Sequence, residues 1–383
     1  MEKNNLEILL HKPRNYYADL LQSNFGFFHF KKPVILFGAA QMGKIYLHLC
    51  KKNKINVLAF VDNNQAKSGK KLDGKDIISI SELMRFPKDI QIIITSIYDE
   101  EILNQLRKIG FARIWPHSFF CTLYPRKFTN PYWQNSLDDI FRDKDKILAC
   151  FDLFKDKMSR KTFLELIKYR LFLDRKCIKK IKQPQEKEYF DKKLINLNQT
   201  EILIDGGAYD GDTVKKFKKV TSDNYVAIYA FEPDRYQFKK LKRNIKKWKD
   251  KRIKIYPYAL AKKETYLAFT NDATLGSRIT TESVSTIKAI SLDKFFRKKR
   301  TTLIKLDIEG AEEDVLRGAK KTITAHLPTL AICIYHKSTD LWRIPLLIKK
   351  YGPNYSFYLR HYGQFIYDTV CYAFISLKKD VHH

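Results

Sequence analysis

The residues best suited to chemistry lie in one twelve-residue stretch, ILIDGGAYDGDT at 202–213. An apolar run ends at the glycine pair Gly206 and Gly207, and a turn with a further glycine leads into a helical pattern. Glycines allow tight turns and a close backbone approach to a ligand, while the helix N-terminus presents free amides. Because the three aspartates of the stretch would repel a diphosphate, we expect a ligand with a positive centre and free hydroxyls.

A second acidic position follows about 20 residues after the glycine loop, the usual spacing for a ribose-binding carboxylate. The sequence AFEPD places Glu232 and Pro233 at the end of another apolar run. A carboxylate there accepts hydrogen bonds from both hydroxyls of a ribose. The glycine loop thus carries acidic residues where a phosphate-binding loop would not, and a ribose-binding carboxylate follows it. This combination is the pattern of an S-adenosylmethionine site.

Two further apolar runs end in residues suited to acid–base work. Asp307 and Glu309 stand two apart after TLIKL, so their side chains share a face at a strand end, where open parallel sheets bind ligands. His336 ends TLAICIYH, and a neutral imidazole there would remove the proton of an attacking hydroxyl. Three alternatives stay open: Glu309 as a helix-capping residue, a structural His336, and a divalent ion such as Mg2+ held by all three.

Other candidates lie at the edges of this pattern. Arg360 and His361 end a later strand run, where substrate loops often lie, and predict either substrate contact or a capping role. Asn271 and Asp272 lie in a loop after the third strand and are expected to approach adenine.

The elements that must position these residues form two strand–helix alternations, which predict parallel sheets. We expect a small Rossmann-like α/β domain at 1–126, a helical connector at 127–199 and a larger α/β domain at 200–383. Within the connector, the residues Phe163, Leu166, Ile167 and Leu171 fall on one helical face. The strands expected in the larger domain are 201–207, 226–233, 253–260, 302–310, 329–336, 355–362 and 369–376, the last two as an antiparallel hairpin.

The small domain carries an incomplete nucleotide-binding motif. Gly38 and Gly43 are the first and third glycines of GxGxxG, but Ala40 replaces the second, which lets a pyrophosphate approach. Ile45 after Lys44 excludes a P-loop, while Asp62 ends the next strand in the ribose-binding place. The motif leaves two alternatives open: binding of a nucleotide or nucleotide sugar, or a degenerate fold used for assembly or substrate presentation.

With these residues in place, the C-terminal part of the chain resembles the FkbM family of class I S-adenosylmethionine-dependent O-methyltransferases. The resemblance is carried by EILIDGGAYDGDT, AFEPD, SLDKF and IKLDIEGAEEDVLRGA, and it covers roughly 140–376. It implies a seven-stranded sheet, S-adenosylmethionine as cofactor, S-adenosylhomocysteine as product, and a sugar or natural-product hydroxyl as acceptor. The cofactor-binding residues that we predict are Asp205, Gly206, Gly207, Ala208, Tyr209, Asp212, Thr213, Glu232, Pro233, Asp272 and Asp307.

Composition and charge limit the partners. The 383 residues carry 72 Lys and Arg against 42 Asp and Glu, a formal charge of +30, and ten of the basic residues lie between Phe238 and Lys254. We interpret most of this charge as solvated surface, with attraction to an acidic substrate or a membrane surface as one alternative and nucleic-acid binding, as an RNA methyltransferase or binder, as the other. No RNA-binding or zinc-finger motif is present, which makes nucleic acid the less favoured partner.

Other features concern location and assembly. The chain has no apolar run of 18 residues and no secretory signal at its start. The six cysteines lie far apart without a CxxC pair, which predicts a reducing cytoplasm. Self-association as a homo-oligomer stays open.

Overall fold

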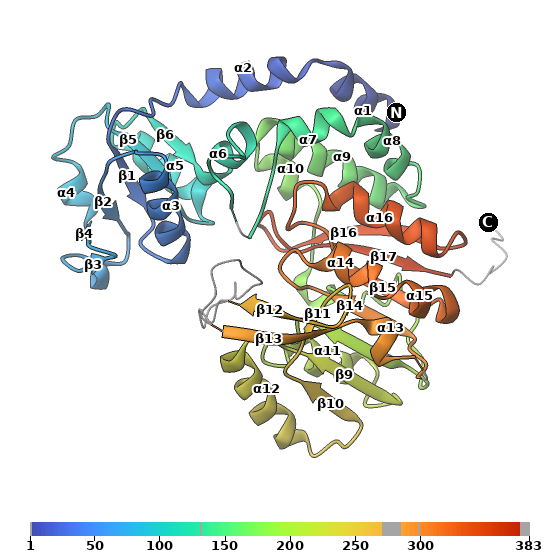
Figure 1. Ribbon diagram of the computed structural model, residues 1–383. Helices are drawn as coiled ribbons and strands as arrows, with labels where there is room; N and C mark the ends of the chain where they lie inside the picture. Colours follow the sequence, from blue (N-terminus) through green and yellow to red (C-terminus); the bar gives the residue numbers. More distant parts are fainter. Residues whose placement is uncertain (1, 131, 270–284, 298, 376–383) are drawn as a thin grey trace.

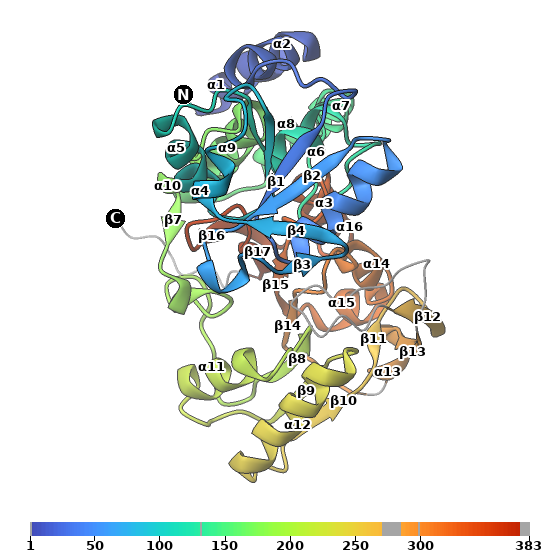
Figure 2. The same cartoon turned by 90° about the vertical axis from the view of Figure 1, so that its left-hand side faces the viewer.

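The computed structural model describes residues 2–130, 132–269, 285–297 and 299–375. Two α/β units, each built on its own sheet, lie to either side of a group of helices (Figures 1 and 2). This confirms the predicted α/β class with two Rossmann-like units and a helical segment between them. Among the described residues, no helix combines the length and apolar character needed to cross a bilayer.

The N-terminal unit is a six-stranded sheet in the order β3-β4-β2-β1-β5-β6. Its strands are β1 (Val34–Phe37), β2 (Val57–Val61), β3 (Lys71–Leu72), β4 (Lys75–Ile78), β5 (Gln91–Ile94) and β6 (Ile114–Pro116). Its helices are α3 (Gln41–Lys52), α4 (Ile80–Leu83) and α5 (Asp99–Lys108). The apolar strands β1 and β5 are buried along their whole length because helices cover both faces of the sheet.

The helical group contains two segments that are distant in sequence. Its members are α1 (Glu2–His11), α2 (Arg14–Phe25), α6 (His117–Leu123), α7 (Leu137–Arg142), α8 (Lys144–Phe151), α9 (Lys157–Phe172) and α10 (Lys176–Lys179). Helices α1 and α2 pack against α7, α8 and α9 instead of the sheet that follows them (Figure 1). The face predicted for α9, formed by Phe163, Leu166, Ile167 and Leu171, is buried. The predicted domain boundaries stay a prediction.

The C-terminal unit is an eight-stranded sheet in the order β10-β9-β8-β14-β15-β17-β16-β7. Its strands are β7 (Lys182–Gln183), β8 (Ile202–Gly206), β9 (Ala227–Phe231), β10 (Ile253–Tyr256), β14 (Leu303–Leu306), β15 (Thr329–Cys333), β16 (Ser356–Tyr362) and β17 (Thr369–Phe374). Its helices are α11 (Asp212–Val220), α12 (Arg235–Trp248), α13 (Leu292–Phe295), α14 (Glu312–Arg317), α15 (Lys320–His326) and α16 (Asp340–Tyr351).

The seven predicted strands of this unit are all present, with two differences. Short β7, from the connector, pairs with β16 and adds an eighth strand. The predicted strand 253–260 breaks after Tyr256, and its second part, β11 (Ala259–Leu260), belongs to a separate sheet with β12 (Thr265–Phe269) and β13 (Ser285–Ile290). The hairpin of β16 and β17 is antiparallel as expected, and β17 lies between β15 and β16.

Strand β8 is central to the site that follows. It pairs in parallel with β9 on one side and with β14 on the other, so the carboxyl ends of three strands meet at one edge of the sheet. The chain order reverses across β8 and β14, and ligands of open α/β sheets bind at such a switch point.

Candidate functional site

The glycine loop leaves β8 in close contact with the end of β14. Gly207 has a φ of +74°, and a Cβ on it would lie 1.8 Å from the backbone oxygen of Asp307. Only glycine therefore fits at this position, which is the close approach predicted for the glycine pair. Gly211, with a φ of +96°, begins α11 and directs the helix N-terminus toward the loop.

A buried ion pair lies beneath the loop. Lys305 Nζ is 3.0 Å from Asp205 Oδ1, and it donates to the backbone oxygen of Gly207 at 2.8 Å. Both side chains are almost fully buried. Burial raises the pKa of Asp205 to about 6 although Lys305 opposes the shift, while the surrounding carboxylates raise the pKa of Lys305 against the effect of burial. Asp205 therefore organises the loop through Lys305.

The rest of the loop is ordered by its own backbone contacts. Ala208 is fully buried, and Tyr209 takes a left-handed φ of +48°. The side chain of Asp212 accepts from the amide of Thr213 at 2.7 Å, within the first turn of α11. Thr213 is buried. These residues form the loop and the first turn of α11. Their contact with a cofactor stays a prediction.

Glu232 stands at the carboxyl end of β9 and spans the gap to the glycine loop. Its Oε2 accepts from the amide of Tyr209 at 2.8 Å, and its Oε1 accepts from the amide of Asp234 at 2.8 Å, across Pro233. Burial raises its pKa to about 7, although the two amides oppose the shift. Each carboxylate oxygen keeps a lone pair for a ligand hydroxyl. Asn271 and Asp272, predicted near adenine, lie outside the described residues.

Asp307, Glu309 and His336 come together at the ends of β14 and β15. His336 Nε2 is 3.6 Å from Asp307 Oδ1 and 3.4 Å from Glu309 Oε2. Glu309 has a left-handed φ of +55°, a strained conformation for a residue with a side chain. Burial opposes ionisation of Asp307, but Lys305 and His336 outweigh it and hold its pKa below the usual value. Burial raises the pKa of Glu309.

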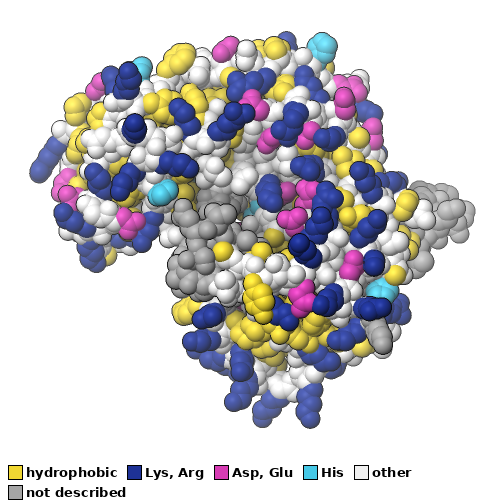
Figure 3. All heavy atoms as spheres, in the orientation of Figure 1, with side chains coloured by type: hydrophobic (Ala, Val, Ile, Leu, Met, Phe, Trp, Pro, Cys, Tyr) yellow, Lys and Arg dark blue, Asp and Glu magenta, His cyan; other side chains and the backbone are white. Residues whose placement is uncertain are grey.

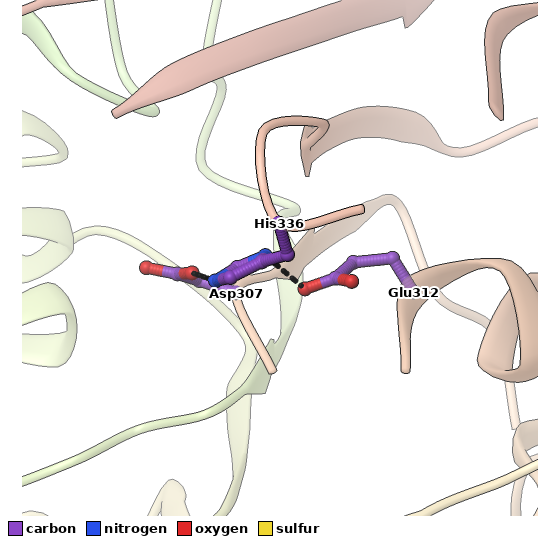
Figure 4. Close-up of side chains that lie close together, drawn as sticks. All are labelled: Asp307, Glu312 and His336. Atoms are coloured by element: carbon purple, nitrogen blue, oxygen red, sulfur yellow. Dashed lines mark ion pairs between the residues drawn. The ribbon is translucent and has the colours of Figure 1, made fainter. Parts of the chain in front are cut away.

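The imidazole of His336 lies between carboxylates on both sides. Its Nδ1 is 3.1 Å from Glu312 Oε1, on the side away from Asp307 (Figure 4). Burial alone would lower the pKa of His336, but Glu312 and Glu309 raise it well above the usual value. The structure therefore favours an imidazolium in the ligand-free protein, where the sequence led us to expect a neutral base.

Asp307, Glu312 and His336 also offer three ligand atoms within 4.8 Å of one another, the kind of group that holds a metal ion. The imidazole ring separates Asp307 from Glu312 (Figure 4). An ion on Nε2 would therefore adjoin Asp307 and Glu309. Glu312 would then support the ring from Nδ1, as carboxylates behind metal-bound histidines do. A proton on Nε2 satisfies the same carboxylates, and this geometry does not require a metal.

Sequence reasoning missed two tyrosines and a carboxylate: Tyr189 and Glu188 from the connector, and Tyr335, which follows β15. Tyr189 OH donates to Asp307 Oδ2 at 2.9 Å, and Tyr335 OH donates to Asp307 Oδ1 at 3.1 Å, so both oxygens of the carboxylate are held. Glu188 beside Tyr189 is 8% exposed, and no described residue hydrogen-bonds its carboxylate. Burial, with Asp368 and Asp307, raises its pKa to about 8. Glu188 and Tyr189 precede β8, and no periodic pattern marks them.

Arg360 and His361 are committed to the scaffold. Arg360 Nη2 donates to Asp156 Oδ2 at 2.6 Å, at the residue that caps α9. His361 Nδ1 lies 2.8 Å from Thr369 Oγ1, and its Nε2 lies 2.8 Å from the backbone oxygen of Phe365. Burial lowers the pKa of His361 to about 4, so its ring is neutral. Substrate contact by this pair gains no support, because its polar groups already have partners.

The incomplete GxGxxG motif of the N-terminal unit, from Gly38 to Gly43, also forms a tight turn between a strand and a helix. A Cβ on Gly43 would lie 2.2 Å from the backbone oxygen of Gly38, so this glycine allows the close packing of α3 on β1. Asp62 accepts from the amide of Ala39 at 2.9 Å and pairs with Lys67 at 2.8 Å. The carboxylate that would hold a ribose thus serves the turn itself.

Fold and site together define a methyltransferase-type α/β domain with a glycine loop, an acidic residue at the end of the second strand, and acids at the end of the fourth. Residues 205–363 match the family model described as the methyltransferase FkbM domain, and this part of the chain belongs to that family. Residues 30–114 match a second model, described as C2185-like, N-terminal.

A solved structure has a similar fold over almost the whole chain. The methyltransferase FkbM from Methylobacillus flagellatus KT is 21% identical and covers 97% of each chain, with a TM-score of 0.74, so the two share a fold. An rRNA methylase from Streptococcus thermophilus is 13% identical and covers 48% of this chain and 90% of its own, with a TM-score of 0.31, too low to support an inference. No curated protein sequence matches the chain.

Proposed function

We propose that this protein is an S-adenosylmethionine-dependent O-methyltransferase that acts on a sugar hydroxyl, in a nucleotide sugar or a surface-glycan intermediate. The observation that carries the proposal is the contact between the glycine loop and the end of β14. At Gly207, the loop that we assign to the cofactor lies directly against the backbone of Asp307. Asp307 in turn belongs to the cluster of proton acceptors at the ends of β14 and β15. The glycine loop is then suited to the cofactor, and the cluster around Asp307 is suited to the acceptor.

The residues around the loop fit S-adenosylmethionine. Glu232 offers two oxygens with spare lone pairs to the ribose hydroxyls. The loop offers the amides at the start of α11 to the methionine carboxylate, and its acids favour the ammonium and sulfonium charges. When bound, the cofactor supplies an electrophilic methyl group, so the chain itself must provide only orientation and proton transfer.

The acceptor end suits a neutral polyhydroxyl compound. Asp307, Glu309 and Glu188 present carboxylate oxygens, and Tyr189 and Tyr335 present aromatic rings edged with hydroxyls. Carboxylates accept hydrogen bonds from hydroxyls, and they repel phosphate groups. The same charges disfavour a nucleic-acid backbone at the reacting end, so a sugar is the better acceptor.

The charged groups around His336 provide a route for the proton of the acceptor hydroxyl. Asp307, fixed by two tyrosines, lies 3.6 Å from Nε2 of His336 and holds the imidazole next to the acceptor hydroxyl. His336 passes its Nε2 proton to Glu309, whose raised pKa makes it a good proton acceptor, and the neutral imidazole then takes the hydroxyl proton. Glu312 keeps the proton on Nδ1 throughout.

The test is a methyl-transfer assay with labelled S-adenosylmethionine and a panel of nucleotide sugars, polyols and RNA. We expect label in a sugar, with the new methyl group on oxygen when the product is analysed by mass spectrometry and NMR. Chelator and added Mg2+ in parallel reactions test the metal alternative. Label in RNA, or on nitrogen or carbon of the acceptor, would contradict the proposal.

A further inference from the structure

The exposed face of α12 carries positive charge that the methyltransferase site does not use. Between Arg235 and Lys249 the sequence has no acidic residue. Figure 3 shows Lys and Arg side chains gathered at the lower end of the molecule, where Figures 1 and 2 both place α12. In contrast, α5 of the N-terminal unit carries charges of both signs, beginning with three acids and ending with two bases.

The charges form one stripe along the helix. Arg235, Lys239, Lys242, Arg243 and Lys246 are all exposed and follow the spacing i, i+4, i+7, i+8 and i+11, which puts them on one face over roughly 16 Å. Within the described residues, none of the five forms an ion pair. The opposite face, with Leu241 and Ile245, packs on the sheet. We call the five exposed basic residues, from Arg235 to Lys246, the basic stripe.

Folding alone does not favour this arrangement. Like charges at i and i+4, such as Arg235 with Lys239 and Lys242 with Lys246, destabilise a helix, whereas alternating acids and bases stabilise it. The helix compensates with a strong N-cap, because the side chain of Asp234 accepts from the amides of Tyr236 and Gln237. A stripe of like charges that has no acidic partner within the helix is therefore better explained by an external anionic partner.

The shape of the surface favours a planar partner over a strand of nucleic acid. The stripe lies on a convex helix at one end of the molecule (Figures 1 and 2). One large aromatic side chain of α12 is well exposed, Tyr236, and Lys240 lies over its ring at 4.4 Å. Single-stranded nucleic acids are bound by grooves with several free stacking rings, which this face lacks.

We propose that the basic stripe of α12 docks the protein on an anionic lipid bilayer. Each basic residue near such a surface strengthens partition by about fivefold, so the stripe alone is sufficient for reversible binding. On the side of α12 away from the stripe, Asn244 Nδ2 donates to the backbone oxygen of Asp210 at 2.9 Å, so the helix links the stripe to the cofactor loop. Docking through α12 therefore places the glycine loop about 10 Å, one helix diameter, from the membrane surface.

The test uses the full chain and sucrose-loaded vesicles of phosphatidylcholine, with or without phosphatidylglycerol, at about 0.15 M salt. The stripe variant replaces Lys239, Lys242, Arg243 and Lys246 by Gln. The control variant replaces Lys51, Lys52, Lys70 and Lys108, which are exposed, unpaired within the described residues and carry the same total charge. Unchanged melting and S-adenosylhomocysteine binding show that each variant is folded.

We expect co-sedimentation with the anionic vesicles alone, weakening as salt rises, unchanged in the control variant and about 100-fold or more weaker in the stripe variant. Three results would overturn the proposal. They are no binding to anionic vesicles, an equal loss in both variants, and tighter binding of the wild type to a competing RNA that also depends on the stripe. Failure here leaves the methyl-transfer assay unaffected.

Discussion

Replacement of Glu232 by Gln is the sharpest test of the cofactor site. In the wild type, both carboxylate oxygens accept a backbone amide at 2.8 Å, one from Tyr209 and one from Asp234. Glutamine has one oxygen, so one amide must face the new NH2 group and loses its partner. The variant keeps the size of the side chain and removes only charge and accepting capacity.

The expected loss follows from these contacts. The unpartnered amide destabilises the free and the bound protein alike, so it lowers the free energy of unfolding and leaves the affinity unchanged. The two bonds from the ribose hydroxyls pass from a charged to a neutral group and weaken by about 1 kcal/mol each. A total of about 2 kcal/mol corresponds to a dissociation constant about 30-fold higher. Calorimetric titration with S-adenosylhomocysteine measures this directly.

The pH dependence gives an independent check. Because burial raises the pKa of Glu232 to about 7, the wild-type carboxyl gains a proton below that pH and one oxygen stops accepting. Wild-type affinity should therefore fall as pH drops from about 8 to 6, while Glu232→Gln, which binds weakly throughout, should show little change.

Glu101→Gln, at an exposed position of α5, serves as the control with the same charge change. If Glu232→Gln binds within about threefold of the wild type while remaining folded, the carboxylate does not hold the ribose, and the reasoning is wrong.

Three further predictions follow from the site. His336→Ala should lower turnover about 10²- to 10⁴-fold with cofactor affinity nearly unchanged, and an equal loss of affinity would make His336 structural. Gly207→Ala should abolish S-adenosylhomocysteine binding, because its Cβ would lie 1.8 Å from the oxygen of Asp307, and retained affinity would mean that the loop can move away from β14. Glu188 has a folded pKa of about 8, so its native state holds a proton that the unfolded chain has lost, and stability falls as pH rises from about 5 to 8. Glu188→Gln should flatten this loss by up to a few kcal/mol in denaturant titrations at the two pH values, and an unchanged slope would show that Glu188 is solvated.

The sequence predicted those parts of the site that follow periodic strands. Glu232, Asp307 and His336 each end an apolar run, and parallel strands bring such ends to one edge. Tyr189 and Glu188 reach the same edge from an irregular segment, whose path depends on tertiary packing. The raised pKa of His336 was also beyond sequence reasoning, because it depends on Glu312, the first residue of α14, which the strand pattern does not place.

The splitting of 253–260 shows the same limit. The apolar run continues through Tyr256 to Leu260, but the chain leaves β10 and pairs with β13, which lies nearly 30 residues later. The local sequence pattern predicts that these residues form a strand, but pairing with residues distant in the sequence decides which sheet the strand joins. Arg360 and His361 end β16, which runs parallel to β15 because both strands are antiparallel to β17, so strand direction alone favoured them as site residues. The sequence pattern did not reveal their partners Asp156 and Thr369, and substrate contact by this pair stays a prediction.

The position of β17 affects how the C-terminal sheet folds during synthesis. Strand β17 is synthesised after β16, yet it fills the gap between β16 and β15. Until it emerges from the ribosome, β15, with the sequence TLAIC, has β14 on one side and an open apolar edge on the other. Such edges template aggregation. We therefore expect nascent chains stalled before residue 369 to require chaperones, and release of β17 to be the step that closes the sheet.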